Sequence, residues 1–180
     1  MKKGINSLKI TVALATLASI SIICGKYLAI PGGEVMRFSL ENMPIILSGM
    51  AFGPIGGMAA GAVADLVGCV MVGYTINPLV TLGAAAIGAI SGLLPIFLRK
   101  VSVKPMLTTA LTVGAAHLVG SVVIKTAGLA AYYSMPFGVL ILWRLLNYLI
   151  VGTLDGLIVH LLLSNKGIKS QLSKLKGDSK

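Results

Sequence analysis

Six apolar stretches run through this chain, and most of its positive charges lie at their ends. Eleven of the fifteen Lys and Arg residues fall into three clusters: Lys2, Lys3 and Lys9; Arg99, Lys100 and Lys104; and Lys166, Lys169, Lys174, Lys176 and Lys180. Only 11% of the residues are charged, whereas a soluble domain carries about a quarter charged residues. The pattern therefore predicts an integral membrane protein in contact with the lipid bilayer. The net charge of +10 comes mainly from Lys and Arg residues at the ends of the expected spans, so no nucleic-acid partner is expected.

The lengths of the apolar stretches predict membrane-spanning helices. A hydrocarbon core about 30 Å thick needs about 20 apolar residues in a helix. We expect an all-α bundle of six transmembrane helices, with residues 1–180 forming a single membrane domain. The expected spans are 8–29, 43–53, 55–73, 78–98, 106–127 and 138–163. Pro54 lies between the second and third spans and predicts a tight hairpin there.

The three basic clusters predict the orientation of the bundle. Cytoplasmic loops of membrane proteins are enriched in Lys and Arg. Both termini are therefore expected in the cytoplasm, with residues 164–180 as a basic cytoplasmic tail. Loops 30–42, 73–78 and 128–137 are then expected outside. These loops and their margins carry the aromatic, Asn, Glu and Arg residues, which predicts a site open to the exterior.

Small residues follow one face of the first span at a spacing of four: Ser7, Thr11, Ala15 and Ser19. Residues four apart lie on the same side of a helix, and small side chains let a second helix come close. The stripe predicts either packing inside the bundle or docking of a partner membrane protein. Gly57 and Gly61 form a similar pair in the third span, and there packing inside the bundle is expected.

Five polar side chains lie inside or near spans: Asp65, His117, Arg144, Asn147 and Asp155. They need partners, because an ionisable group in hydrocarbon is costly. In one interpretation Asp65 pairs with His117 or Arg144 and holds the bundle together. In the other, Arg144 and Asn147 point from one helix face into an outward cavity and bind ligand. Arginine suits a carboxylate because its planar fork donates two parallel hydrogen bonds.

Catalytic and metal-binding patterns are missing from the sequence. It has no G-x-x-x-x-G-K-[ST] phosphate loop, no H-E-x-x-H or C-x-x-C motif and no G-x-S-x-G elbow. Two His, two Cys and five acidic residues leave little for a catalytic site. We expect no enzyme, no catalytic residues, no metal ligands and no cofactor in this chain. His117 is expected to make a packing hydrogen bond.

Residues 36–83 carry four motifs in close succession. They are Met36-Arg-Phe-Ser-Leu-Glu-Asn-Met-Pro-Ile-Ile-Leu-Ser-Gly49, Phe52-Gly-Pro-Ile-Gly-Gly57, Ala64-Asp65-x-x-Gly68 and Gly73-Tyr-Thr-Ile-Asn-Pro78-x-x-Thr81-x-Gly83. Together with the six-span plan, these motifs resemble the S components of energy-coupling-factor (ECF) vitamin transporters. The resemblance is greatest to the folate-specific family, FolT.

The resemblance implies a substrate-capture subunit, multi-pass in the cell membrane of a prokaryote. Such a subunit binds its vitamin from outside and then docks on an ECF transmembrane coupling protein and two cytoplasmic ATPases, which use ATP. The family typically docks through an Ala-x-x-x-Ala pattern on the first span. Here Thr11, Ala15 and Ser19 keep the small size but not the two alanines.

The resemblance also implies a folate site. The carboxylates of folate are expected at Arg37, Lys125 and Arg144, and its pterin edge, or that of a related pteridine, at carboxylates or amides. The candidates for the pterin edge are Glu41, Asn42, Asp65, Asn77 and Asn147. Tyr74 and Asn77 are expected to order a lid made of loops 30–42 and 73–78. Phe38, Tyr74, Tyr132, Tyr133 and Trp143 offer aromatic walls, although Tyr132 and Trp143 also suit an interfacial belt.

Two alternatives stay open from the sequence. The chain resembles S components for other small vitamins or bases, such as a queuosine precursor or pantothenate. It also has the composition of a structural membrane subunit that binds no ligand.

Overall fold

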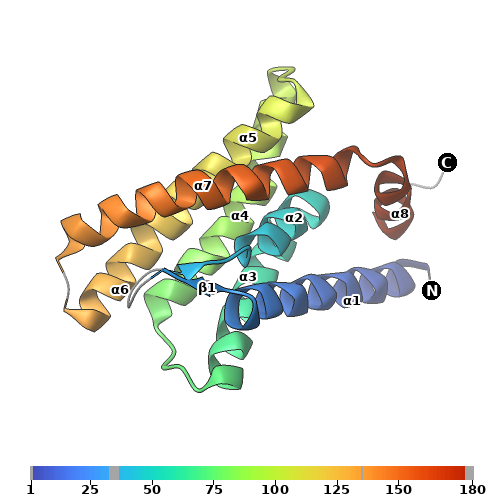
Figure 1. Cartoon of the computed structure of the whole chain (residues 1–180). Coiled ribbons are helices and arrows are strands. Elements are labelled where there is room, and N and C mark those ends of the chain that lie inside the picture. The colour runs from blue at the N-terminus through green and yellow to red at the C-terminus, as the bar shows by residue number, and fades with distance from the viewer. Residues whose placement is uncertain (1, 33–36, 135, 177–180) are drawn as a thin grey trace.

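The computed structural model describes residues 2–32, 37–134 and 136–176, and most of them are helical (Figure 1). The elements in chain order are α1 (Lys2–Ile22), η1 (Ile23–Tyr27), β1 (Ile30–Pro31), β2 (Arg37–Phe38), α2 (Asn42–Phe52), α3 (Pro54–Val72), α4 (Pro78–Lys100), α5 (Pro105–Ala116), η2 (His117–Ile124), α6 (Lys125–Tyr133), α7 (Phe137–Ser164) and α8 (Lys166–Lys176). The prediction of an all-α membrane protein is confirmed.

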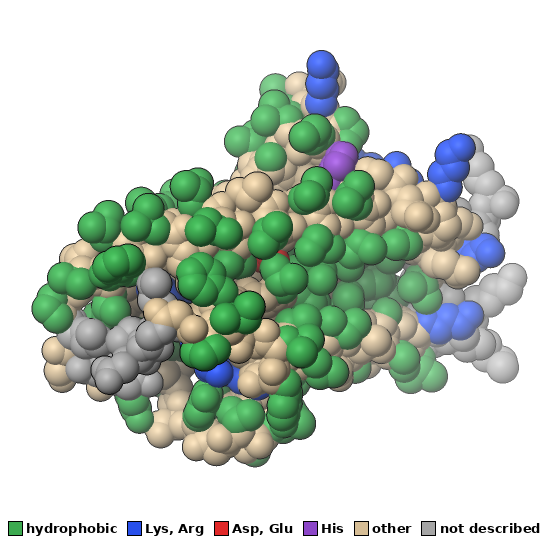
Figure 2. All heavy atoms as spheres, in the orientation of Figure 1, with side chains coloured by type: hydrophobic (Ala, Val, Ile, Leu, Met, Phe, Trp, Pro, Cys, Tyr) green, Lys and Arg blue, Asp and Glu red, His purple; other side chains and the backbone are tan. Residues whose placement is uncertain are grey.

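Five helical segments are long and apolar enough to cross a membrane, and α2 is apolar but shorter. The two π-helical segments do not interrupt them: η1 continues α1, and α5, η2 and α6 form one long helix. Figure 2 shows hydrophobic side chains over most of the visible face, while many Lys and Arg side chains lie at the end with the two termini and at the tip of the α4–α5 connection. The sides of the bundle therefore suit a lipid environment.

Two sequence expectations about connections are revised. The expected loop 128–137 is wrong for 128–133, because α6 continues to Tyr133. No proline interrupts that stretch, and the helix ends at Ser134 in the left-handed region (φ 53°). The expected tail 164–180 contains the helix α8, whereas residues 177–180 lie outside the described part of the chain.

The predicted α2–α3 hairpin is present and turns at a glycine. Gly53 has φ 87°, a conformation that costs glycine little. Pro54 follows as the first residue of α3, where its missing N–H is not needed by the helix. The two helices therefore reverse direction within one residue.

Small residues bring α3 and α4 together. A Cβ atom on Gly57 would overlap with the Gly88 carbonyl, and one on Gly61 would overlap with the Ala84 carbonyl. The predicted packing role of Gly57 and Gly61 inside the bundle is thus confirmed. Glycine at such positions lets membrane helices approach closely without bulky side chains between them.

A short antiparallel ribbon crosses one end of the bundle. Ile30 of β1 pairs with Phe38 of β2, and Pro31 pairs with Arg37. The intervening residues 33–36, including Met36 of the first sequence motif, lie outside the described residues. The Asn147 side-chain amide of α7 donates a hydrogen bond to the Arg37 carbonyl at 3.1 Å. This bond fixes the ribbon against the last long helix.

Candidate functional site

A cavity of about 740 Å³ lies between the ribbon, η1 and the ends of α3, α4, α6 and α7. Eight of the nine binding residues proposed from the sequence line it: Arg37, Glu41, Asp65, Tyr74, Asn77, Lys125, Arg144 and Asn147. They come from segments spread over more than a hundred positions of the chain. The cavity falls within the volume range of small-molecule sites.

Asn42 is the exception among the sequence candidates. It is fully buried at the start of α2 and is not part of the cavity wall. Its Oδ1 accepts a hydrogen bond from Lys125 Nζ at 3.4 Å, and its Nδ2 donates to Ser121 Oγ at 3.4 Å. Asn42 therefore orients Lys125 from behind the wall instead of facing the cavity.

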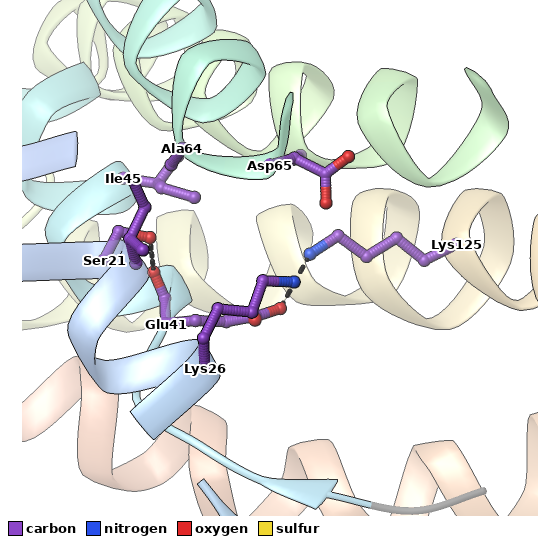
Figure 3. Close-up of a pocket in the computed structure, with 9 residues that line it drawn as sticks. Ser21, Lys26, Glu41, Ile45, Ala64, Asp65 and Lys125 are labelled. Atoms are coloured by element: carbon purple, nitrogen blue, oxygen red, sulfur yellow. Dashed lines mark hydrogen bonds and ion pairs between the residues drawn. The ribbon is translucent and has the colours of Figure 1, made fainter. Parts of the chain in front are cut away.

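Four charged side chains converge at the inner end of the cavity (Figure 3): Lys26, Glu41, Asp65 and Lys125. Lys125 Nζ lies 3.0 Å from Glu41 Oε1, and the space between the four groups holds about 10 Å³, close to one water molecule. Glu41 precedes α2, outside the spans. The Lys125 ammonium lowers the pKa of Glu41 to about 2 against the opposing effect of burial, with smaller help from Lys26 and Arg144.

The end of the first long helix holds Glu41 in place. Ser21 Oγ donates a hydrogen bond to the Glu41 carbonyl at 2.6 Å. Gly25 provides the room for the side chain, because a Cβ atom there would lie 2.6 Å from Glu41 Oε2. The position of the carboxylate is thus set by α1 and η1 as well as by Lys125.

Arg144 is anchored by a backbone carbonyl. Its Nε and Nη2 donate to the Ser121 carbonyl at 3.2 and 3.1 Å, and Nη2 also donates to the Tyr148 hydroxyl at 3.3 Å. Ser121 lies in η2, and π-helical turns are frequent at functional sites. The guanidinium is therefore held in one orientation at the cavity wall.

The segment 73–77 contacts three neighbouring elements. The Tyr74 ring centre lies 5.5 Å from both Lys26 Nζ and Arg37 Cζ, within the range of cation–π contacts. Asn77 accepts from the Leu79 amide at 3.1 Å, which caps α4, and donates to the Gly128 carbonyl at 2.8 Å. Tyr74 and Asn77 thus connect this segment to β2, η1 and α6.

The expected pairing of Asp65 with His117 or Arg144 is wrong. Asp65 Oδ2 accepts from Thr81 Oγ1 at 2.6 Å, because α3 packs directly against α4. His117 Nε2 instead lies 3.0 Å from Asp155 Oδ2 on α7. Its ring stacks on Tyr148 at 4.9 Å between centroids.

A serine, a histidine and an aspartate contact one another in the order found in a hydrolase triad. Ser121 Oγ lies 3.3 Å from His117 Nδ1, and the other ring nitrogen of His117 contacts Asp155. All three are buried, with exposed fractions of 0%, 3% and 0%, and none lines the cavity. The arrangement has no access for a substrate. It serves helix packing, as predicted for His117.

The sequence interpretation missed two cavity residues with strong contacts, Lys26 and Tyr148. Tyr148 follows Arg144 by one helical turn, so the same-face spacing that selected Asn147 would also have selected it. Lys26 is a single charge at the end of an apolar stretch, which looked like a flanking residue. Among the proposed aromatic walls, Tyr74 and Tyr132 line the cavity, whereas Trp143 is an exposed residue of α7 outside it.

The small-residue stripe of α1 lies on the outside of the bundle. Ser7, Thr11, Ala15 and Ser19 are all exposed, while Ala18 and Ile22 are buried. Packing inside the bundle is therefore not the role of this stripe.

Known structures with the same fold include two proteins of low sequence identity. The structure of FolT bound with folic acid aligns with a TM-score of 0.68 at 19% identity, covering 83% of this chain and 89% of that one. An S component for biotin from an ECF-type ABC transporter aligns with a TM-score of 0.66 at 17% identity, covering 91% and 95%. At these identities the likeness establishes the fold. No curated protein matches the chain.

The sequence profile of one family matches residues 5–170, and it is described as the ECF-type riboflavin transporter, S component. S components bind substrate without a cofactor, and ATP is used by the ECF module. The resemblance to ECF S components is thus confirmed, while the profile is named for riboflavin instead of folate. The cavity, the membrane-spanning helices and the profile together show that this chain belongs to the prokaryotic family of ECF-type S components, and that it is a multi-pass, substrate-binding transport subunit and not an enzyme.

Proposed function

We propose that this S component captures folate, or a closely related pteridine with a carboxylate tail. The observation that carries the proposal is the charge of the cavity wall. Four cations, Lys26, Arg37, Lys125 and Arg144, face two carboxylates, Glu41 and Asp65, among the described lining residues. The excess of two positive charges matches the two carboxylates of folate.

The contacts of the cations support an anionic ligand. Of these four cations, only Lys125 has a carboxylate partner within ion-pair distance among the described residues. Arg144 contacts a carbonyl and a hydroxyl, and Arg37 lies against the Tyr74 ring. Arg37 is exposed, but Lys26 and Arg144 are half-buried, and partly burying a cation without a counter-charge is costly. A dianionic ligand would offset that cost, whereas a neutral ligand would leave it in place.

Riboflavin is the competing substrate, because the matched family profile carries its name. Its ring system is neutral, so it would rely on the aromatic and amide groups of the wall and not on the cations. Equilibrium binding of folate, riboflavin and thiamine to the detergent-purified chain separates the two. We expect tight folate binding without ATP. Tight binding of riboflavin instead of folate would overturn the folate assignment and leave the family assignment unchanged. Binding of none of the three vitamins would favour a structural subunit that binds no ligand.

Single substitutions test the role of the cations. Arg37→Ala and Arg144→Ala are expected to weaken folate binding by about tenfold or more each, since hydrogen bonds to charged groups contribute about 1.5–3 kcal/mol. Arg99→Ala provides the matched control, because Arg99 is exposed at the end of α4, away from the cavity residues. Native folate affinity in both cavity variants would refute this assignment.

We further propose that Thr11, Ala15 and Ser19 form the docking face for the ECF transmembrane coupling protein and its two ATPases. Their exposure on α1 supports it. Ala15→Leu is expected to abolish co-purification with the ECF module, since a bulky side chain blocks close helix approach. Thr16→Leu is the control, because Thr16 is exposed and lies about 100° around α1 from Ala15. Intact assembly of the Ala15→Leu protein would argue against this docking face.

A further inference from the structure

The C-terminal helix α8 does not continue the direction of α7. Figure 1 shows it turning at the end of α7 and lying beside the N-terminal end of α1, and it packs against both helices. Asn165 makes the turn: its backbone is extended, and its side chain accepts from the amides of Gly167 at 2.8 Å and Ile168 at 3.3 Å. A side-chain cap of this kind starts a new helix. The change of direction is thus encoded in the sequence.

The two sides of α8 differ in character. Ile168, Leu172 and Leu175 are half-buried and recur at spacings of four and three, on one face of the helix. Lys166, Lys169 and Lys174 are exposed. An apolar face opposite a lysine-rich face is typical of helices that lie in the plane of a membrane surface.

Among the described residues, Lys166, Lys169 and Lys174 of α8 have no carboxylate partner. No Asp or Glu occurs between positions 156 and 177, and the two ion pairs of the described residues involve neither these lysines nor any other part of α8. Figure 2 shows Lys and Arg side chains gathered at the end of the molecule where the termini lie. This surface therefore calls for an anionic partner from outside the chain.

The length of α7 identifies where that partner is met. A helix of 28 residues is about 42 Å long, which exceeds a hydrocarbon core of about 30 Å. The end of α7 therefore reaches the headgroup layer, and α8 begins there. We propose that α8 is a membrane-surface helix whose lysines bind the headgroups of acidic phospholipids. The bound headgroups supply the missing negative charge and fix this end of the bundle at the bilayer surface.

A single tryptophan on α8 tests the proposal in the full-length protein. Ser170 is exposed on α8, so Ser170→Trp in a Trp143→Phe background places the only tryptophan beside the lysines. The protein is reconstituted into vesicles containing either brominated phosphatidylglycerol or brominated phosphatidylcholine, which quench a nearby tryptophan. We expect about threefold or more stronger quenching by the acidic lipid, falling towards equality in about 0.5 M salt. Trp143 of the wild-type chain, exposed at the other end of α7, is expected to be quenched equally by both lipids.

Charge variants complete the experiment. Replacing Lys166, Lys169 and Lys174 by Gln in the Ser170→Trp protein should abolish the preference for the acidic lipid. Replacing Arg99, Lys100 and Lys104 by Gln removes the same charge elsewhere and should leave the preference intact. Equal quenching by the two lipids in the Ser170→Trp protein would overturn the proposal. An acidic protein surface would then be the better candidate partner for the lysines. A preference that survives the α8 replacements would overturn it as well.

Discussion

Arg144 and Tyr148 depend on side chains that never reach the cavity. Tyr148 stacks on His117, and Asp155 holds the other side of the His117 ring through its 3.0 Å contact. The Tyr148 hydroxyl then accepts from Arg144 Nη2. A buried polar network of this kind restricts its members to one arrangement. The orientation of Arg144 therefore depends on His117 and Asp155 in the interior of the bundle.

Tyr148→Phe separates that positioning role from simple packing. The variant keeps the ring and its stacking on His117 but removes the hydroxyl that Arg144 contacts. Folate affinity is expected to fall about three- to tenfold, the value of about one hydrogen bond, while the melting temperature in detergent stays close to that of the wild type. Calorimetric titration and thermal unfolding check the two quantities. A loss of stability without a loss of affinity would assign Tyr148 to packing alone.

Glu41 makes the stability of the protein depend on pH. Its pKa in the folded state is about 2, below the ordinary value of 4.5, because of the Lys125 ammonium. A lowered pKa means that the stabilisation is present above about pH 4.5 and is lost as the pH falls towards 2. The side chain is 27% exposed, and the full shift corresponds to at most about 3 kcal/mol. Melting temperatures measured from about pH 7 down to about pH 3 should therefore decrease in the wild type.

Glu41→Gln is the control for this pH dependence. It leaves Lys125 buried without a carboxylate partner, so the variant is expected to be less stable than the wild type at neutral pH, by about 3 kcal/mol. The stability difference between the two proteins should shrink as the pH falls below about 4.5. A constant difference over that range would exclude Glu41 as the titrating group.

At the scale of the elements, the α3–α4 contact tolerates the least change. The Gly57 carbonyl occupies the place where a Gly88 side chain would lie. Gly88→Ala is expected to destabilise the protein by about 1–3 kcal/mol, as overpacking does. Gly114→Ala in α5 is the matched control, because nothing lies within 4 Å of its added Cβ atom. Thermal unfolding in detergent should show a lower melting temperature for the first variant only.

The positions of the helices could be predicted because strong local signals mark them. Pro54, Pro78 and Pro105 each stand at the first residue of a helix, close to where the apolar stretches begin. The extension of α6 to Tyr133 could not be predicted in the same way. Its residues are compatible with helix or loop, and tertiary contacts such as Asn77 with the Gly128 carbonyl favour the helix.

The sequence was enough to predict most of the polar residues that line the cavity, but not the contacts that they make. Arg144 and Asn147 were identified because polar groups inside an apolar helix need a reason to be there. Asn42 sits beside Glu41 in sequence, yet one faces away from the cavity and the other into it. That difference depends on the direction in which α2 begins, which Ser21 and Lys125 determine from distant parts of the chain.

For the whole molecule, the two ends of the bundle differ in chemistry. The cavity residues lie at one end, and the basic clusters flank the other ends of the same helices. From the positive-inside rule we therefore expect the cavity to face outward. Thr75→Cys, at an exposed position beside the cavity, should react with a membrane-impermeant maleimide in intact cells. Lys104→Cys, exposed between α4 and α5, should react only after permeabilisation, and the reverse pattern would invert the topology.

The hydrogen bond between Asn147 and the Arg37 carbonyl joins residues 110 positions apart, and the ion pair of Lys125 with Glu41 joins residues 84 apart. Protein synthesis makes these partners at very different times. When the ribbon and Glu41 first emerge from the ribosome, the helices that carry Lys125 and Asn147 have not been synthesised. The cavity can close only after α7 has been inserted, so substrate cannot assist the earlier steps of membrane insertion. A chain truncated before α7 would keep Lys125 but lack Arg144 and Asn147, so the ribbon would lose its hydrogen bond to α7.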